Sequence, residues 1–219
     1  MKIKNIKKLD KKYKIFNDEG GTSTIYSDNN QLLYKIFCNY RDVFFEKRLE
    51  KMSKLNTSFF AVPIENIYLK NKLIGYIMYR KDGVTFEKLN LNTLIEDLLN
   101  SFLKLEDDLK ILSLNNIRIL DLHDGNILFD SIKKEINIID TDEYGTLYTY
   151  DDLYNVNIRS IAILLLDYLN LKKYNIDSNN IDSIKTLITN IKQLIYILEE
   201  INKKEINRVG DIKSLSKVL

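Results

Sequence analysis

The stretch from residue 117 to residue 144 constrains this chain most, because two short apolar runs alternate there with acidic polar clusters. It reads IRILDLHDGNILFDSIKKEINIIDTDEY. Its runs ILF and INII have the length of short strands, and the polar residues between them indicate a turn. Such a hairpin can bring three oxygen-bearing side chains around one point, those of Asp121, Asn126 and Asp140. Magnesium suits such ligands, since proteins usually hold it with one or two carboxylates and substrate phosphates.

The loop resembles the catalytic loop of the protein-kinase-like superfamily, which has the form D-x-x-x-x-N. Asp121 and Asn126 have this spacing, and the run D-L-H-x-G-N-I-L is most similar to the aminoglycoside-phosphotransferase and atypical-kinase branches. The apolar run that ends at Asp140 resembles the strand before D-F-G, although this chain reads D-T-D. The resemblance implies that Asp121 orients and deprotonates an acceptor hydroxyl. It also implies that Asn126 and Asp140 hold the metal ions that bridge the phosphates of ATP.

Composition is that of an ordinary folded protein of one domain or two small lobes, with 219 residues, 45% of them hydrophobic and 29% charged. The net charge of +2 gives no argument for a nucleic-acid partner. Cys38 is the single cysteine, which excludes an intrachain disulfide and favours a cytoplasmic location. The longest apolar runs fall far short of the ~20 residues of a membrane span, so we expect no transmembrane segment.

Residues 13–37 read as a meander of three short strands, at 13–16, 24–26 and 32–37. By resemblance, the first turn covers the phosphates of the nucleotide. Backbone N–H groups there can wrap phosphate oxygens, because glycine permits close approach. The residues in question are Gly20, Gly21, Thr22 and Ser23. An ordinary turn is the alternative interpretation.

Lys35 stands between apolar residues in the third strand, and alternation places it on one face with Leu33 and Phe37. Burying its ammonium group requires a compensating anion, whereas solvent exposure at a sheet edge requires none. We favour a phosphate-binding lysine, paired with a carboxylate from a helix predicted over 42–55. Glu46 and Glu50 are both candidates, and the spacing from Lys35 ranks Glu50 slightly ahead.

Strands are predicted at 60–64, 67–69 and 73–79. The resemblance implies that the last of them ends the small lobe, with Met78 behind the adenine. The backbone from Tyr79 to Lys81 would then face the base. An ordinary strand and turn is the alternative.

The larger, C-terminal part is predicted to be helical. Apolar spacing predicts one long amphipathic helix over 93–112 with Asn92 as its N-cap, and further helices over 158–169, 184–201 and 211–219. The helix over 158–169 resembles a buried helix of the kinase large lobe, and Asn157 stands where that family has Asp. The segment from Asp140 to Asn157 is short, which argues against a platform for protein substrates.

These expectations combine into an α+β, two-lobed, protein-kinase-like fold, with a small β-rich lobe over 1–82 and a reduced helical lobe over 83–219. The expected activity is ATP-dependent and Mg²⁺-dependent transfer of the γ-phosphate to a hydroxyl, on a protein Ser/Thr or on a small molecule. The alternative is a weakly active or inactive nucleotide-binding or scaffold protein. Ile119 supports that alternative, because the family has His at this place before the catalytic Asp.

Overall fold

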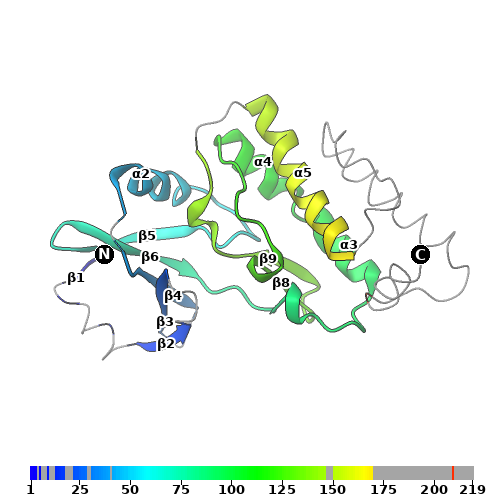
Figure 1. The fold of residues 1–219 in the computed structure, drawn as a ribbon, viewed down its shortest axis with the longest axis horizontal. Coiled ribbons are helices and arrows are strands. Elements are labelled where there is room, and N and C mark those ends of the chain that lie inside the picture. The colour runs from blue at the N-terminus through cyan, green and yellow to red at the C-terminus, as the bar shows by residue number, and fades with distance from the viewer. Residues whose placement is uncertain are drawn as a thin grey trace, which may run out of the picture. The chain divides into compact units, whose positions relative to one another are not determined.

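A computed structural model describes residues 1–3, 5, 9, 13–17, 22–28, 31–39, 41–146, 150–169 and 209. The described part is mixed α+β (Figure 1). The chain divides into two units, the first made of Met1–Thr57 with Ala61–Lys81, the second of Ser58–Phe60 with Asp82–Leu219. Helices predicted over 184–201 and 211–219 lie outside the described residues.

The first unit contains a six-stranded sheet in the order β1-β5-β6-β4-β3-β2. Antiparallel pairing joins all neighbours except β1 and β5, which are parallel. The predicted meander is confirmed as β2, β3 and β4. Of the two runs predicted at 60–64 and 67–69, residues 63–69 form the single strand β5, and residues 60–62 precede it. The strands are β1 (Lys2–Ile3), β2 (Lys14–Asn17), β3 (Ser23–Ser27), β4 (Leu32–Phe37), β5 (Pro63–Leu69) and β6 (Lys72–Tyr79).

Helix α2 (Val43–Met52) covers one face of this sheet. Asp42 begins the helix, because its carboxylate accepts a 2.8 Å hydrogen bond from the Phe45 amide. The rings of Phe37 in β4 and Phe45 in α2 meet edge to face at 5.2 Å. Apolar residues at helical spacing make the buried side of α2, namely Phe45, Leu49 and Met52. The helix ends three residues earlier than predicted.

The opposite face of the sheet is also apolar and buried. Its cluster consists of Leu9, Tyr26, Tyr34, Ile36, Ile67 and Ile77. Alternation along β4 sends Tyr34 and Ile36 to this cluster and Lys35 and Phe37 to the α2 side. Both faces of the sheet are therefore covered at β4, and only 5% of the surface of Lys35 is exposed. Solvent exposure at a sheet edge, the alternative for Lys35, is wrong, because β4 is an inner strand.

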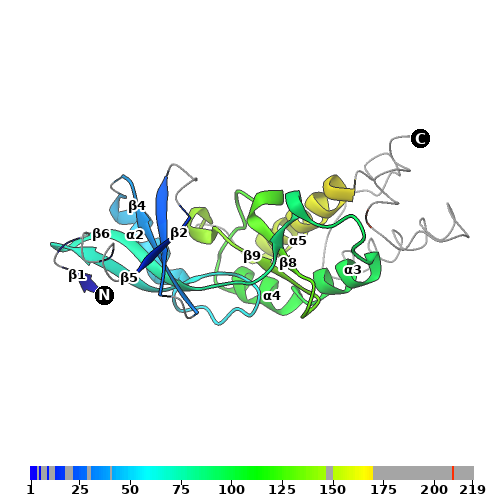
Figure 2. The same cartoon turned by 90° about the horizontal axis from the view of Figure 1, so that it is seen from below.

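The second unit holds a three-stranded antiparallel sheet in the order β7-β8-β9. The predicted hairpin is confirmed, with Ile127 opposite Ile138 and Asp130 opposite Glu135. Its strands are β7 (Val84–Thr85), β8 (Ile127–Asp130) and β9 (Glu135–Ile138), and its short 3-10 turns are η1 (Phe86–Lys88), η2 (Asp124–Asn126) and η3 (Thr141–Glu143). The helices are α3 (Ile95–Leu103), α4 (Glu106–Leu114) and α5 (Tyr150–Leu169). Helices α4 and α5 pack against each other (Figures 1 and 2).

The prediction of one helix over 93–112 is wrong, because α3 and α4 are separate. The chain tightens between them, and the Leu105 amide bonds to the Phe102 carbonyl at 3.2 Å. This turn keeps the three-residue spacing of the apolar side chains, so both Phe102 and Leu105 stay fully buried. The apolar pattern of the sequence is therefore the same as that of one unbroken helix. Acidic residues in the first turn of α4 were the missed signal, since they favour a helix N-terminus.

Asn92 is not the N-cap of α3. Asn90 organises a turn over 90–93 instead, since its side chain accepts from the Asn92 amide at 2.9 Å and its carbonyl accepts from the Thr93 amide. The helix therefore begins only after Leu94. Helix α5, in contrast, begins eight residues before its predicted start, which places Asn157 inside the helix. Among the helices that the structure describes, none has both the length and the apolar character needed to cross a membrane.

Candidate functional site

The loop between Asp121 and Asn126 is closed by the asparagine. Its side-chain amide nitrogen donates to the Asp121 carbonyl at 2.9 Å, and its backbone amide donates to the His123 carbonyl at 2.9 Å. Asn126 is buried, whereas the Asp121 side chain is exposed. Because the amide nitrogen is committed to a carbonyl, the amide oxygen of Asn126 is the atom that can accept a donor or ligate a cation.

Asn126 also connects this loop to the end of β9. Its carbonyl accepts a 2.9 Å hydrogen bond from the amide of Ile139, the residue before Asp140. Asp121 and Asp140 both have left-handed backbones, with φ values of 55° and 58°. Aspartate tolerates this conformation better than most residues, although it still stores strain. One asparagine thus fixes the chain at two carboxylates.

A second connection joins the same two segments of the chain, farther along the sequence from the loop. The amide of Arg118 donates to the Gly145 carbonyl at 2.7 Å, and the Gly145 amide returns a 3.0 Å bond to Arg118. This pair joins the chain before Asp121 to the chain after Asp140. Both carboxylates therefore lie on segments that are tied together at either end, a preorganised arrangement of the kind that sites require.

Asn157 anchors the approach to the loop from α5. Fully buried, it accepts a 2.8 Å bond from the Ile119 amide and donates to the Ile117 carbonyl at 2.9 Å and the Ser113 hydroxyl at 3.1 Å. An ionised aspartate only accepts, so it could not donate to that carbonyl. Asparagine is therefore better suited to these neighbours than the aspartate that the sequence resemblance leads one to expect at this place.

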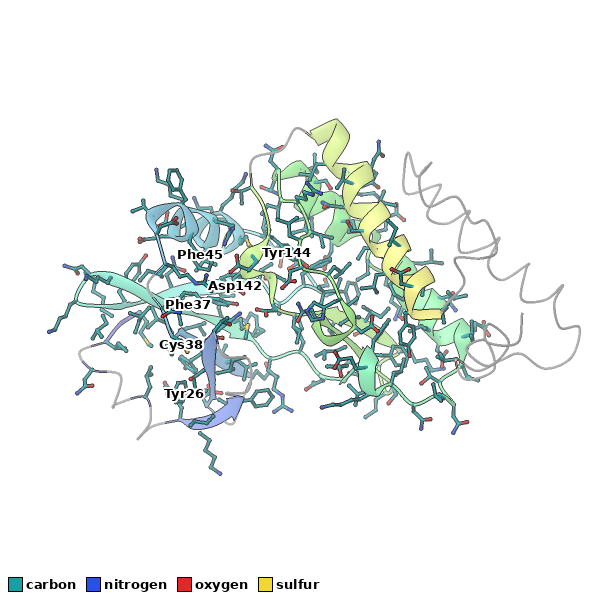
Figure 3. The ribbon with its side chains drawn as sticks, viewed as in Figure 1. Tyr26, Phe37, Cys38, Phe45, Asp142 and Tyr144 are labelled. Carbon is teal, nitrogen blue, oxygen red and sulfur yellow. The ribbon has the colours of Figure 1, made fainter. Side chains whose placement is uncertain are left out.

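Tyr144 ends the η3 turn that Asp140 begins, and it was not recognised from the sequence. It is 1% exposed, and among the described residues its buried hydroxyl has no hydrogen-bond partner. Burial raises the pKa of Tyr144 far above its ordinary value, and the negative charges of Asp140 and Asp121 raise it further. The two carboxylates are thus within electrostatic reach of one hydroxyl. Figure 3 labels Tyr144 and Asp142 on the segment that follows β9.

His123 has a structural bond inside the loop. Its Nδ1 accepts from the Gly125 amide at 3.1 Å, while the ring itself is exposed. A Cβ at Gly125 would lie 3.0 Å from the His123 ring and 3.2 Å from a carboxylate oxygen of Glu87. Glycine therefore allows the imidazole to fold over the turn.

Two neighbours of this loop differ in their environment. Asp142 is buried with 1% exposure, so it is not a solvated turn residue. Asp124 is only partly exposed, and its charge adds to burial in raising the pKa of Tyr168 to about 12.

The candidate residues of the first unit surround β4. The ammonium of Lys35 lies 5.9 Å from the centre of the Tyr76 ring, on the face covered by α2. Glu46 is half-buried and accepts a 2.8 Å hydrogen bond from the Tyr68 hydroxyl, whereas Glu50 is exposed. The pairing of Lys35 with either glutamate stays a prediction.

The remaining candidates belong to two turns. Gly20 and Gly21 lie outside the described residues, while Thr22 is exposed and bonds through its carbonyl to the Cys38 amide at 2.9 Å. Ser23 is buried at the start of β3. At the end of β6, Met78 is buried, Tyr79 is exposed and Lys81 is half-buried. Their contact with a nucleotide stays a prediction.

The residues present fit a magnesium ion that arrives with phosphates. No cluster of three or more His, Cys, Asp or Glu side chains suited to a metal occurs among the described residues. An all-protein cage is therefore not present in that part of the chain. The pair of Asn126 oxygen and Asp140 carboxylate matches the sparse protein ligation of magnesium, in which phosphates and water supply the other ligands.

No family model matches this chain, and no curated protein matches it in sequence.

Proposed function

We propose that this chain is an ATP-dependent phosphotransferase with a two-lobed, protein-kinase-like fold, which moves the γ-phosphate to a hydroxyl acceptor. The observation that carries the proposal is the connection of Asp121 to Ile139 through Asn126. It supports a common role for the three polar residues that the resemblance singles out. Asn126 bonds to Asp121 through its side chain, and through its backbone carbonyl it bonds to Ile139, the residue before Asp140.

Each residue of the loop then has a chemical role. The chemistry that a magnesium ion would supply here is positive charge to offset that of the triphosphate. Asn126 and Asp140 would hold the ion through the amide oxygen and the carboxylate. Asp121 would accept the proton of the acceptor hydroxyl. The oxygen of that hydroxyl would form the new bond to the γ-phosphorus as the bond from the γ-phosphorus to the leaving ADP breaks. The exposure of Asp121 supports this role, because a general base must reach its substrate.

Lys35 would contribute the cation that faces the phosphates. Its burial supports this, since a buried ammonium group is stable only beside anions. We propose Glu46 as its partner, because the Tyr68 hydroxyl holds that carboxylate, and Glu50 remains the alternative favoured by spacing. The turn with Gly20 and Gly21 would cover the phosphates.

For the acceptor, the short segment after Asp140 favours a small molecule over a protein Ser/Thr. Helix α5 begins at Tyr150, so few residues remain between the metal-binding carboxylate and the helix. The second candidate function, a nucleotide-binding scaffold, is favoured by Ile119. Its buried side chain occupies the place of the family's histidine.

The test measures the transfer of label from γ-labelled ATP, in the presence of Mg²⁺, by the wild-type protein and by Asp121→Asn. We expect label transfer by wild type and a loss of about 10²–10⁴-fold in the variant. Nucleotide affinity should stay within about threefold, since Asp121 touches the acceptor and not the nucleotide. Label in the low-mass fraction indicates a small acceptor, and label on polypeptide indicates a protein. Binding of Mg–ATP without turnover by either form would support the scaffold, and no binding at all would refute both functions.

A further inference from the structure

The Tyr144 hydroxyl is a buried polar group that the proposed reaction does not yet use. Its oxygen is shielded from solvent and has no hydrogen-bond partner among the described residues. Leaving a buried donor unsatisfied costs about 1–3 kcal/mol. Phenylalanine would fill the same space without this cost. The hydroxyl therefore calls for an explanation other than packing.

The backbone and ring of Tyr144 are held in place. Its amide donates to the Thr141 carbonyl at 3.2 Å, which closes the η3 turn, and the next residue is bonded to Arg118 on both sides. Its ring meets Phe60 edge to face at 6.3 Å. These contacts hold the ring in place and thereby fix the position of the hydroxyl oxygen.

Asp140 is the acceptor best placed to meet this hydroxyl. It begins the η3 turn that Tyr144 ends, and the electrostatic effect of its charge on the Tyr144 hydroxyl exceeds that of Asp121. A carboxylate has two oxygens and about four acceptor positions. One oxygen can ligate a cation while the other accepts from a hydroxyl, and ligating carboxylates in proteins are commonly held in this way.

We propose that Tyr144 is a positioning residue whose hydroxyl donates a hydrogen bond to the Asp140 carboxylate when that carboxylate holds the metal ion of a bound nucleotide. This inference rests on the proposed function. It assigns to the loaded state a bond that the described structure lacks. Tyr144 thereby sets which oxygen of Asp140 faces the cation.

The experiment measures the affinity for Mn²⁺ by electron paramagnetic resonance, in the presence of a non-hydrolysable ATP analogue. Tyr144→Phe should weaken Mn²⁺ binding by about 10–100-fold, the usual effect of losing such a supporting bond. Nucleotide affinity without metal should not change. The melting temperature without ligand should stay the same or rise, because the variant keeps the ring and removes an unsatisfied donor.

Tyr168→Phe is the matched control, since it removes another buried phenol from the same unit, near Asp124 rather than Asp140. Its Mn²⁺ affinity should equal that of wild type. Equal affinity in wild type and Tyr144→Phe would overturn the inference and leave the proposed function intact. A lower melting temperature for Tyr144→Phe without ligand would also overturn it, because the hydroxyl would then be structural. Wild type that binds no Mn²⁺–nucleotide would overturn the proposed function itself.

Discussion

The side-chain amide of Asn126 donates a 2.9 Å hydrogen bond to the backbone carbonyl of Asp121, five residues earlier. The same residue accepts through its own carbonyl from Ile139, immediately before the second carboxylate, Asp140. Asn126 therefore couples the conformations of two left-handed aspartates. In the proposed reaction, the general base and the metal-binding carboxylate depend on this one residue for their placement.

The first prediction concerns Asn126→Ala. We expect a loss of stability of about 1–3 kcal/mol, because the Asp121 carbonyl loses the hydrogen bond from the Asn126 side chain, whereas the backbone bond from Ile139 remains. Phosphotransfer should fall much further than stability, since the proposed metal ligand is lost as well. Urea unfolding and ATP turnover measure the two effects.

Asn137→Ala is the control, because Asn137 is also a buried asparagine whose amide bonds to a carbonyl, that of Asp82, at 3.0 Å. It should lower stability similarly without a specific loss of turnover per folded molecule. Equal losses of turnover in both variants would contradict the role of Asn126.

A second prediction follows from the three bonds of Asn157. Asn157→Asp introduces the residue that the protein-kinase-like superfamily has at the corresponding place, but it replaces the donor to the Ile117 carbonyl with an acceptor. We expect destabilisation at pH 7 of about 1–3 kcal/mol. Burial should raise the pKa of the introduced carboxyl in the folded protein. The loss of stability should therefore be small at pH values below the pKa of the carboxyl in the unfolded chain, and it should grow as the pH rises above that pKa.

Urea midpoints of Asn157→Asp and wild type at pH 4 and pH 7 test this sign. A penalty that is equal at both pH values would contradict the prediction, because it would show that the introduced carboxyl ionises as readily in the folded protein as in the unfolded chain. A more stable variant at pH 7 would mean that the Ile119 amide alone determines the preference at this site.

The third prediction concerns Gly75, at the place where the neighbouring strands β4 and β6 pair beside Lys35. A Cβ at Gly75 would lie 2.1 Å from the Lys35 carbonyl, which is backbone and cannot move alone. Gly75→Ala should therefore cost about 1–3 kcal/mol or more and displace Lys35. Gly125→Ala is the comparison, because its Cβ would meet only side-chain atoms, at 3.0 Å or more. Thermal unfolding should show the larger loss for Gly75→Ala, and the reverse order would contradict the geometry.

A fourth prediction uses alkaline pH. The pKa of Tyr168 is raised to about 12, from 10 in the unfolded chain, first by burial and then by Asp124. The unfolded state thus releases this proton first, so the stabilisation is complete below pH 10 and is lost as pH rises toward 12. Tyr168→Phe should reduce the loss of stability between pH 9.5 and pH 11.5, as measured by urea midpoints. An unchanged pH dependence would show that the Tyr168 phenol is not protected in the folded state.

The sequence by itself determined the elements whose pattern is local. Alternation predicted the three-strand meander and the hairpin, and apolar spacing identified the buried side of α2, because side-chain periodicity follows directly from backbone geometry. It also assigned Lys35 to the face of Phe37. The same reasoning failed at the break between α3 and α4, where a tight turn keeps the apolar spacing while it ends the helix.

Only the tertiary structure decided which polar groups meet. Asn157 is 38 residues from Ile119, and no local pattern indicates that its amide bonds to that backbone. Tyr144 carries no motif at all, and its importance comes from burial beside two carboxylates. Periodicity reports which way a side chain points relative to its neighbours along the chain. Hydrogen-bond partners across the fold depend on how separate elements pack, which no spacing encodes.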